Sequence, residues 1–311
     1  MTAIDIVDSG AISAQAETLL KQMFADGWVI PSPENIQQYR KELRIGYQAN
    51  IDNAIAQFKG DITEVYIDGV NCLQITPSGW GKKNRRCIQY AYGGGYVSGS
   101  TQEDLTITTA LASKSSSRVV SVNYRLAPEH PFPAPQDDFA QVYPALLDKY
   151  GSKRLAVSGE SAGGNQALAL LHRAGRERWP MPACALLFSP WIDLIQSGDS
   201  HVSNEGRDPT LDNAGARAMA AMFANGHPRE DPLISPLFGS MEGLPPIMIT
   251  AGSRDNLMSD SLRLSRKLHN AGVECDLRLW EGLWHVFEFY PIPEAKISIA
   301  EAGAFIKKHC R

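Results

Sequence analysis

The sequence has few cysteines, and their spacing forms no pattern typical of disulfides or metal sites. There are five, an odd number without any C-x-x-C pair: Cys72, Cys87, Cys184, Cys275 and Cys310. Cys87, Cys184 and Cys275 fall within strand-like runs, where a thiol behaves as a small core residue. We therefore expect no disulfide framework and a reducing compartment, which predicts a cytoplasmic location.

Targeting, membrane and nucleic-acid signals are also missing. Residues 1–10 lack the basic and apolar regions of a secretory signal, and no apolar stretch is long enough to span a bilayer. The net charge is −4, and the densest basic group, residues 82–86, precedes a predicted strand, so we interpret it as a solvated loop. No metal-ligand spacing is visible. We expect no nucleic-acid partner, no membrane span, no metal and no cofactor.

Alternating helix and strand periodicity is present along most of the 311 residues. Residues 1–59 predict helices, one over Gln15–Phe24 and a second that begins with Ser32 as its N-cap. Asp68-Gly69 between two strand-like runs predicts a β-hairpin. From Cys87 onward, strands and helices alternate, which predicts an α/β fold with a mostly parallel, doubly wound sheet.

One long segment breaks the alternation. Residues 192–243 contain no predicted strand, but the stretch Asp212–Asn225 has a helical pattern rich in Ala and Met. A long insertion between core strands, on the side where the strands end, usually covers a site in such sheets.

The most informative motif is Gly159-Glu160-Ser161-Ala162-Gly163. An apolar run precedes it and a helical pattern follows, which is the strand–turn–helix context of a nucleophile elbow. The turn holds Ser161 out at its tip, while Gly159 and Gly163 omit side chains where strand and helix approach. A serine hydroxyl becomes a useful nucleophile only beside a general base.

A glycine-rich motif, Tyr92-Gly93-Gly94-Gly95-Tyr96, directly follows another predicted strand. Consecutive glycines allow backbone N–H groups to approach a substrate oxygen. We expect Gly93 and Gly94, together with Ala162 after the nucleophile, to form an oxyanion hole.

The base and the acid are expected in later loops, in the order serine, acid, histidine. Of seven histidines, only His285 lies in a loop just past the final strand. The loop after the preceding strand offers Asp255. Asp260 competes with it, but Asp260 begins a predicted helix, where the helix dipole explains a carboxylate. We favour Asp255, which would accept the second ring N–H of His285.

Together these motifs resemble the hormone-sensitive-lipase-like family of α/β hydrolases, the GDXG or family IV esterases. Residues 92–96 (YGGGY) match HGGG[FY], residues 124–134 match YRLAPEHPFPA, and residues 159–164 (GESAGG) match G[DE]SAGG. Residues 255–257 (DNL) are similar to D-P-L and residues 285–287 (HVF) to H-x-F. Tyr92 departs from the family pattern, because it replaces a histidine that usually supports the oxyanion loop.

The resemblance covers about residues 60–311 and implies an α/β-hydrolase catalytic domain there. It implies a helical cap built from the N-terminal helices, residues 1–59, and the insertion, residues 192–243. It also implies carboxylester hydrolysis. Candidate pocket residues are Phe24, Trp28, Tyr92, Tyr96, Trp191, Met219, Met222 and Phe223.

The leading hypothesis is a serine esterase for small, mostly apolar esters or lactones. Ser161 would attack the carbonyl, with His285 as base and Asp255 as acid. The partner would be the small-molecule substrate, and a homodimer is an open alternative to a monomer. A ligand-binding receptor derived from this family is another hypothesis, but some plant hormone receptors of this type lack the histidine that is present here. Amide or formamide hydrolysis differs only in the leaving group, which the sequence does not specify.

Overall fold

A computed structural model describes residues 11–24, 29–81 and 85–311, and its centre is an eight-stranded sheet. The spatial order is β1-β2-β4-β3-β5-β6-β7-β8. The strands are β1 (Gly60–Ile67), β2 (Val70–Pro77), β3 (Cys87–Ala91), β4 (Arg118–Val122), β5 (Leu155–Glu160), β6 (Cys184–Phe188), β7 (Ile247–Gly252) and β8 (Cys275–Trp280). The two pairs that involve β2 are antiparallel, and all other neighbours are parallel. This confirms the predicted mostly parallel sheet.

The hairpin forms at the predicted dipeptide. Asp68 and Gly69 have φ values of 49° and 83°, so the two-residue turn has the backbone that fits the right-handed twist of its strands. The turn pairs Ile67 with Val70 and sets the register of the whole β1–β2 ladder. The hairpin forms one edge of the sheet, and β8 forms the opposite edge.

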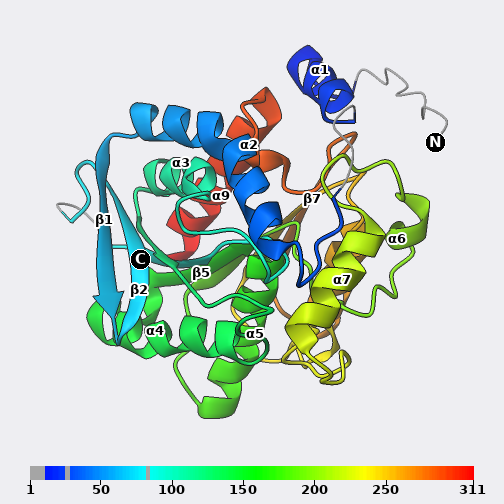
Figure 1. Ribbon diagram of the computed structural model, residues 1–311. Helices are drawn as coiled ribbons and strands as arrows, with labels where there is room; N and C mark the ends of the chain where they lie inside the picture. Colours follow the sequence, from blue (N-terminus) through cyan, green and yellow to red (C-terminus); the bar gives the residue numbers. More distant parts are fainter. Residues whose placement is uncertain (1–10, 25–28, 82–84) are drawn as a thin grey trace.

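Helices cover both faces of the sheet, as expected for a doubly wound fold. The helices are α1 (Ala14–Met23), α2 (Ile36–Gln57), α3 (Leu105–Ser115), α4 (Ala134–Tyr150), α5 (Ala162–Glu177), α6 (Ser200–Ser203), α7 (Asn213–Ala224), α8 (Met258–Asn270) and α9 (Pro293–His309). Short 3₁₀ turns are η1 (Ser152–Arg154), η2 (Pro236–Phe238) and η3 (Phe287–Phe289). Figure 1 shows α3 and α9 on one side of the sheet and α4 and α5 on the other.

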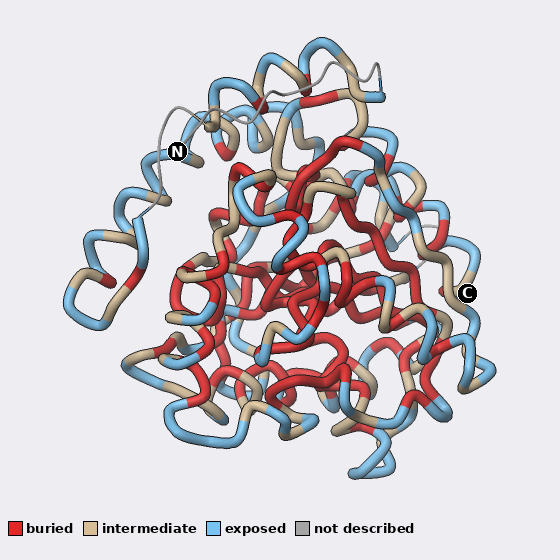
Figure 2. The backbone as a smooth tube through the Cα atoms, turned by 90° about the vertical axis from the view of Figure 1, so that its right-hand side faces the viewer, coloured by how far each residue is buried: buried red, intermediate tan, exposed pale blue. Residues whose placement is uncertain are grey.

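The central strands are buried along their whole length. Every residue of β3, β5, β6 and β7 is buried, which explains why these strands are continuous apolar runs rather than alternating ones. Figure 2 shows this buried core at the centre of the molecule, with exposed residues concentrated on the outer helices and loops. Of the three cysteines predicted to lie in strands, Cys87 and Cys184 are buried in this core, whereas Cys275 is half-buried; all five thiols are free.

The N-terminal helices differ in one detail from the sequence-based prediction. The second helix begins at Ile36, with Asn35 in the cap position, rather than just after Ser32. The Asn35 side chain accepts the N–H of Ser32, so residues 32–35 form a turn before the helix starts. Helix α1 packs in a small hydrophobic cluster that is separate from the main core. This cluster includes Trp284 and Phe287 from the segment after β8.

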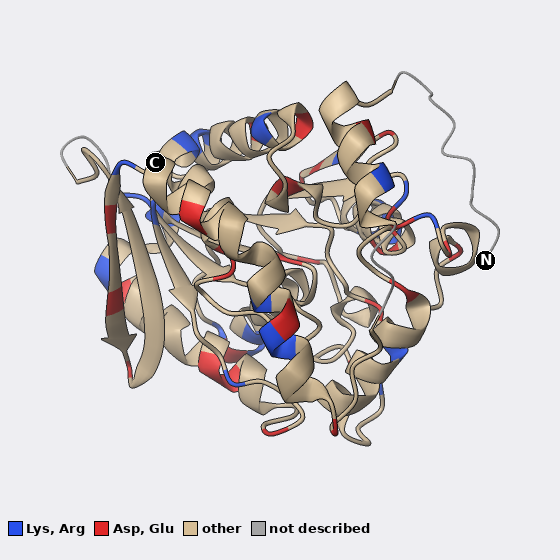
Figure 3. Cartoon of the chain, turned by 45° about the horizontal axis from the view of Figure 1, so that its top comes forward, with Lys and Arg blue, Asp and Glu red and all other residues tan. Residues whose placement is uncertain are grey.

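The insertion contains no strand in residues 192–243, as predicted, and adds α6 and α7. The beginning of α2 lies beside α7, although the two are far apart in sequence (Figure 1). Among the described residues, no helix is both long and apolar enough to cross a bilayer. In Figure 3 the Lys and Arg positions along the ribbon are interspersed with Asp and Glu positions, so no block of one sign stands out in this view.

Candidate active site

Ser161 lies at the sharp turn between β5 and α5. Its φ and ψ are 52° and −119°, a strained combination for a residue with a side chain. The turn is held by the Ser161 N–H, which donates to the Phe188 carbonyl at 2.9 Å. A Cβ at Gly163 would collide with the Ala91 carbonyl, so only glycine allows this close approach of helix and strand. The backbone therefore has the geometry of a nucleophile elbow.

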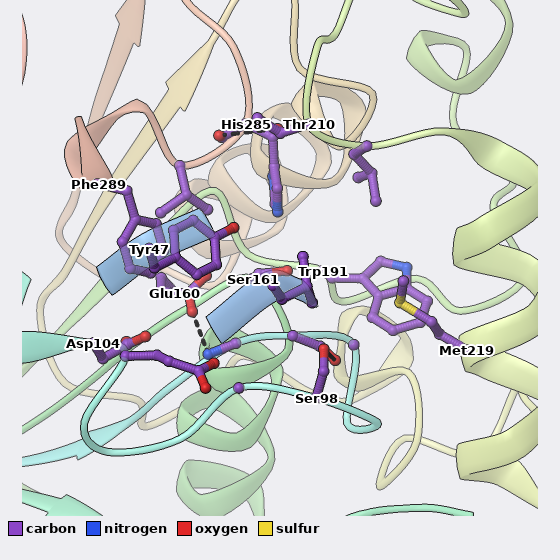
Figure 4. A pocket seen from close by; sticks show the side chains of 18 of the residues that line it. Tyr47, Ser98, Asp104, Glu160, Ser161, Trp191, Thr210, Met219, His285 and Phe289 are labelled. Atoms are coloured by element: carbon purple, nitrogen blue, oxygen red, sulfur yellow. Dashed lines mark hydrogen bonds between the residues drawn. The ribbon is translucent and has the colours of Figure 1, made fainter. Parts of the chain in front are cut away.

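His285 and Asp255 meet across 30 positions of sequence. The distance between His285 Nδ1 and Asp255 Oδ2 is 3.1 Å, and both side chains are buried. In Figure 4 the His285 ring points toward Ser161. Burial alone would lower the pKa of His285, but the carboxylates of Asp255, Asp208 and Glu288 raise it overall.

Asp260, the competing acid, has other partners. Its Oδ2 accepts the N–H groups of Ile192 and Asp193, each at 2.9 Å. Its Oδ1 lies 3.8 Å from His201 Nε2. Asp260 therefore joins α8 to the start of the insertion, and it has no bond to His285 among the contacts of the described residues.

The oxyanion loop differs from the prediction at one glycine. The sequence predicts Gly93 and Gly94 as donors, but the Gly93 N–H already donates to a carboxylate oxygen of Glu160. In the described part of the chain, the N–H groups of Gly94 and Gly95 have no backbone or side-chain acceptor. Ala162 is the first residue of α5, where helical N–H groups also lack a partner within the helix. Among the described residues, Gly94, Gly95 and Ala162 thus offer backbone N–H groups without a protein acceptor near Ser161.

The loop conformation itself requires glycine at position 94. Gly94 has a φ of +87°, and its carbonyl accepts the N–H groups of Val97 and Ser98 at 3.1 and 2.9 Å. A Cβ at this position would strike the Ser98 backbone. Gly95 follows in the same turn and lines the cavity beside Ser161.

A buried carboxyl pair, Asp104 and Glu160, lies beside this loop, and no motif in the sequence predicted it. Asp104 accepts the Tyr90 hydroxyl at 2.8 Å, and Glu160 accepts the Gly93 N–H. Burial raises the pKa of Asp104 to about 8, with a further contribution from Glu103. Burial, then the nearby Asp104, raises the pKa of Glu160 as well. At neutral pH the pair therefore holds at least one proton.

A cavity of about 120 Å³ opens beside Ser161 and His285. Its walls come from the oxyanion loop, from α2, from the insertion and from the loop after β8; residues that line it include Tyr39, Leu43, Tyr47, Glu103, Trp191, Thr210, Leu211, Met219, Phe289 and Tyr290. Figure 4 shows Tyr47 and Phe289 on one side of Ser161, and Trp191 and Met219 on the other. The cavity is thus mostly aromatic and aliphatic, with carboxyl groups at one end.

Only part of the predicted pocket list lies on this cavity. Trp191 and Met219 line it, whereas Phe24, Tyr92, Tyr96, Met222 and Phe223 are not among its lining residues. Phe24 packs with α1 on the Trp284 cluster instead. Trp28 lies outside the described residues. The sequence also failed to indicate Tyr39, Leu43 and Tyr47, because the periodicity of α2 does not reveal what its partly buried face contacts.

Tyr92 and Tyr96 do not line the cavity, and their side chains bond and stack with residues around the oxyanion loop. The Tyr92 hydroxyl donates to the Tyr124 carbonyl at 2.9 Å, and the Tyr124 hydroxyl donates back to the Tyr92 carbonyl at 2.7 Å. Their rings stack with centroids 4.2 Å apart. Tyr96 stacks on Phe223 of α7 and donates to Asn165. These residues are therefore scaffold around the loop rather than walls of the cavity.

Comparisons with known proteins agree with this architecture. Residues 88–289 match the model of a family described as having the alpha/beta hydrolase fold. The chain is 34% identical over 229 residues to an acetyl-hydrolase of Streptomyces hygroscopicus, covering 73% of this chain and 77% of that protein. It is 35% identical over 222 residues to an esterase of Acinetobacter venetianus, covering 70% and 73%.

Solved structures extend the similarity to almost the whole chain. A crystal structure of a hormone-sensitive lipase from a metagenome library superposes with a TM-score of 0.86 at 33% identity, covering 94% of this chain and 97% of that one. An esterase from the bacterial hormone-sensitive lipase family superposes with a TM-score of 0.87 at 30% identity, covering 96% and 99%. The chain therefore belongs to the hormone-sensitive-lipase-like family of α/β hydrolases.

Proposed function

We propose that this protein is a serine carboxylesterase that acts through an acyl-enzyme intermediate. One observation carries the proposal: the His285 ring, bonded at Nδ1 to Asp255, points toward Ser161 at the tip of the elbow. The names of the relatives, an acetyl-hydrolase and an esterase, support ester hydrolysis as the reaction.

In the first half-reaction, Ser161 Oγ attacks the ester carbonyl carbon while His285 Nε2 accepts the hydroxyl proton. The negative charge moves to the carbonyl oxygen, where the N–H groups of Gly94, Gly95 and Ala162 stabilise it. Asp255 stabilises the imidazolium through Nδ1 and keeps the ring oriented. Collapse of the tetrahedral intermediate breaks the bond to the alcohol, which leaves with the proton from His285.

In the second half-reaction, water replaces the alcohol. His285 takes a proton from the water, the hydroxide adds to the acyl carbonyl, and the same N–H groups hold the second oxyanion. Proton return from His285 to Ser161 Oγ then releases the carboxylic acid. Every step uses groups that line the cavity or bond to those that do.

The cavity favours small, neutral substrates. Its volume of about 120 Å³ and its aromatic walls suit a short acyl group or a small lactone ring. Neither Lys nor Arg is among the described residues that line it, so an ester with a negative charge would lose its hydration there without gaining an ion pair. We further propose that α2 and residues 192–243 act as the cap, because both contribute lining residues.

The central test is Ser161→Ala, assayed with p-nitrophenyl esters, lactones and anilides beside the wild-type protein. We expect loss of ester hydrolysis by about 10⁶-fold, the size of triad knock-outs in subtilisin. A folded Ser161→Ala variant that keeps more than a few per cent of activity would refute the serine mechanism. Faster hydrolysis of the anilides than of the esters would identify an amidase, and no turnover of any substrate would favour a binding protein.

A further inference from the structure

The insertion does more than cover the cavity, because one short segment of it bonds to the loops that carry the base and the acid. Asp208 Oδ2 accepts the backbone N–H of His285 at 3.1 Å. Thr210 Oγ1 lies 3.3 Å from the His285 carbonyl oxygen. Both polar backbone groups of His285 therefore face residues that precede it by 77 and 75 positions. Figure 4 shows Thr210 next to His285.

The acid loop is held by the same segment. Asn204 Nδ2 donates to the carbonyl oxygens of Ser253 and Asp255, at 3.1 and 2.8 Å. Asn256 Nδ2 donates in turn to the Leu211 carbonyl at 2.9 Å. Residues 204–211 thus bridge the two loops whose side chains form the His285–Asp255 pair.

Asp208 occupies a special position in this segment, because it is a fully buried carboxyl group with three donors. Besides the His285 N–H, its Oδ1 accepts both the N–H and the hydroxyl of Thr210, each at 2.8 Å. Its side chain is 1% exposed. Three donors favour the carboxylate over the protonated acid and so oppose the effect of burial.

We propose that Asp208 is a positioning residue for the general base: it fixes the main chain of His285 and, as a carboxylate, stabilises the imidazolium that forms during turnover. The proposal rests on the proposed role of His285 as base. It adds a second negative charge, which contacts the backbone N–H of His285 rather than its ring, and that charge comes from the insertion rather than from the hydrolase core.

The surrounding charges are consistent with this role. The groups that act on His285 are Asp255, Asp208 and Glu288, and all three raise its pKa against the effect of burial. Burial, followed by the nearby Asp255, raises the pKa of Asp208 to about 7, while His285 and Thr210 lower it. When His285 is protonated, its positive charge favours the ionised form of Asp208. The two groups therefore stabilise each other when His285 has accepted the proton of Ser161.

Asp208→Asn tests the proposal, with kcat/KM measured from pH 5 to 9. The substitution removes the charge and can place an amide N–H₂ against the backbone N–H of His285, which is itself a donor. We therefore expect the plateau value of kcat/KM to fall about 10- to 100-fold, as for one lost buried hydrogen bond. The lost carboxylate destabilises the imidazolium and lowers the pKa of His285. Because the base must be neutral, the acid limb should move to lower pH by at least about 0.5 unit.

Two further variants separate positioning from general loosening of the insertion. Thr210→Val removes the hydroxyl that donates to Asp208, so the ionised form of Asp208 is less favoured. The acid limb of the kcat/KM profile should therefore also move to lower pH, by a smaller amount than in Asp208→Asn. Ser235→Ala removes the acceptor of a buried backbone N–H, that of Leu194, in the same insertion without changing charge near His285. For Ser235→Ala the pH midpoint of kcat/KM should stay at the wild-type value even if the Tm falls.

The outcomes are distinct. A shift in Asp208→Asn or Thr210→Val that Ser235→Ala lacks supports the proposal, and Thr210→Val serves alone if Asp208→Asn does not fold. An unchanged midpoint in the folded variants, or an equal shift in Ser235→Ala, overturns it. Failure of the proposed function itself would appear separately, as activity that persists in Ser161→Ala.

Discussion

The two halves of the proposed active site are held in place by different means. Ser161 and the oxyanion loop depend on backbone geometry: a strained φ at the nucleophile, a positive φ at Gly94 and glycines where a Cβ would collide. His285 and Asp255 depend on side chains that come from far along the chain, namely Asn204 and Asp208. The first half depends on local backbone conformations that require glycine, whereas the second depends on hydrogen bonds between residues far apart in sequence.

This difference determines what each half tolerates. A substitution on the oxyanion side acts sterically and should change activity without changing the pH at which the base titrates. A substitution on the histidine side acts through charge and hydrogen bonding and should change both.

Asp255→Asn should cost on the order of 10⁴-fold in kcat, by analogy with the same change in the chymotrypsin-type triad. The amide cannot stabilise the imidazolium, and its N–H₂ favours the wrong ring tautomer. Steady-state kinetics with a p-nitrophenyl ester measure the loss. Asp260→Asn is the matched comparison, because it should lower Tm through its bonds to Ile192 and Asp193 but reduce kcat far less. The reverse order of kcat losses would identify Asp260 as the acid.

Gly94→Ala should reduce kcat about 10²- to 10³-fold, the range for one lost oxyanion donor. The new Cβ would strike the Ser98 backbone and turn the following N–H away from the cavity. The pH midpoint of kcat/KM should stay at the wild-type value, unlike that of Asp208→Asn.

Gly79→Ala controls for the strain of the positive φ. Gly79 has a φ of +80°, close to that of Gly94, but nothing lies within 4 Å of an added Cβ. Both variants bear the strain of a positive φ, but Gly94→Ala should lose more stability because its Cβ also meets the Ser98 backbone, and only Gly94→Ala should lose activity. Equal activity losses would contradict the steric account of the oxyanion loop.

The motifs of the local half were predictable from the sequence, and the reason is physical. A close backbone approach requires glycine, so Gly159 and Gly163 mark the elbow directly. Even here one donor was misassigned, because the sequence does not show that the Glu160 side chain folds back onto Gly93. That contact could be suspected only from an acidic residue placed immediately before the nucleophile.

The long-range half was only partly predictable. The chain order of hydrolase motifs led to Asp255 and His285, and the structure brings these two together. No pattern in the sequence around Asp208 indicates its contact with His285, because an aspartate in a loop of the insertion resembles any solvated surface residue. The same limit applies to α2, where only the tertiary contacts reveal Tyr39 and Tyr47 as cavity walls.

Tyr92→Phe should reduce kcat less than tenfold, the effect of one ordinary hydrogen bond of about 1 kcal/mol. The ring keeps its stack on Tyr124, and only the bond from the hydroxyl to the Tyr124 carbonyl is lost. Thermal unfolding should report a small decrease in Tm. A kcat loss as large as that of Gly94→Ala, with the loop unchanged in a crystal structure, would make the phenol a catalytic donor.

Asp104→Asn should affect the pH dependence of stability more than activity. Because the folded state holds a proton on Asp104 up to about pH 8, it binds more protons than the unfolded chain, whose aspartates titrate near pH ~4. Stability contributed by this group therefore falls as pH rises from about 4 to 8. The variant lacks this loss, so its Tm relative to wild type should be higher at pH 8.5 than at pH 5.5 in scanning calorimetry. A Tm difference that does not vary with pH would mean that Asp104 is ionised throughout.

The bonds from Asn204 and Asp208 also bear on how this enzyme can be recombined with its relatives. Exchange of the whole insertion, residues 192–243, would remove the partners of both catalytic loops along with the walls of the cavity. A chimera that keeps residues 192–211 and exchanges only 212–243 would retain them and still replace Met219. The natural boundary for transplanting substrate preference in this chain therefore lies inside the insertion, after Leu211, rather than at its ends.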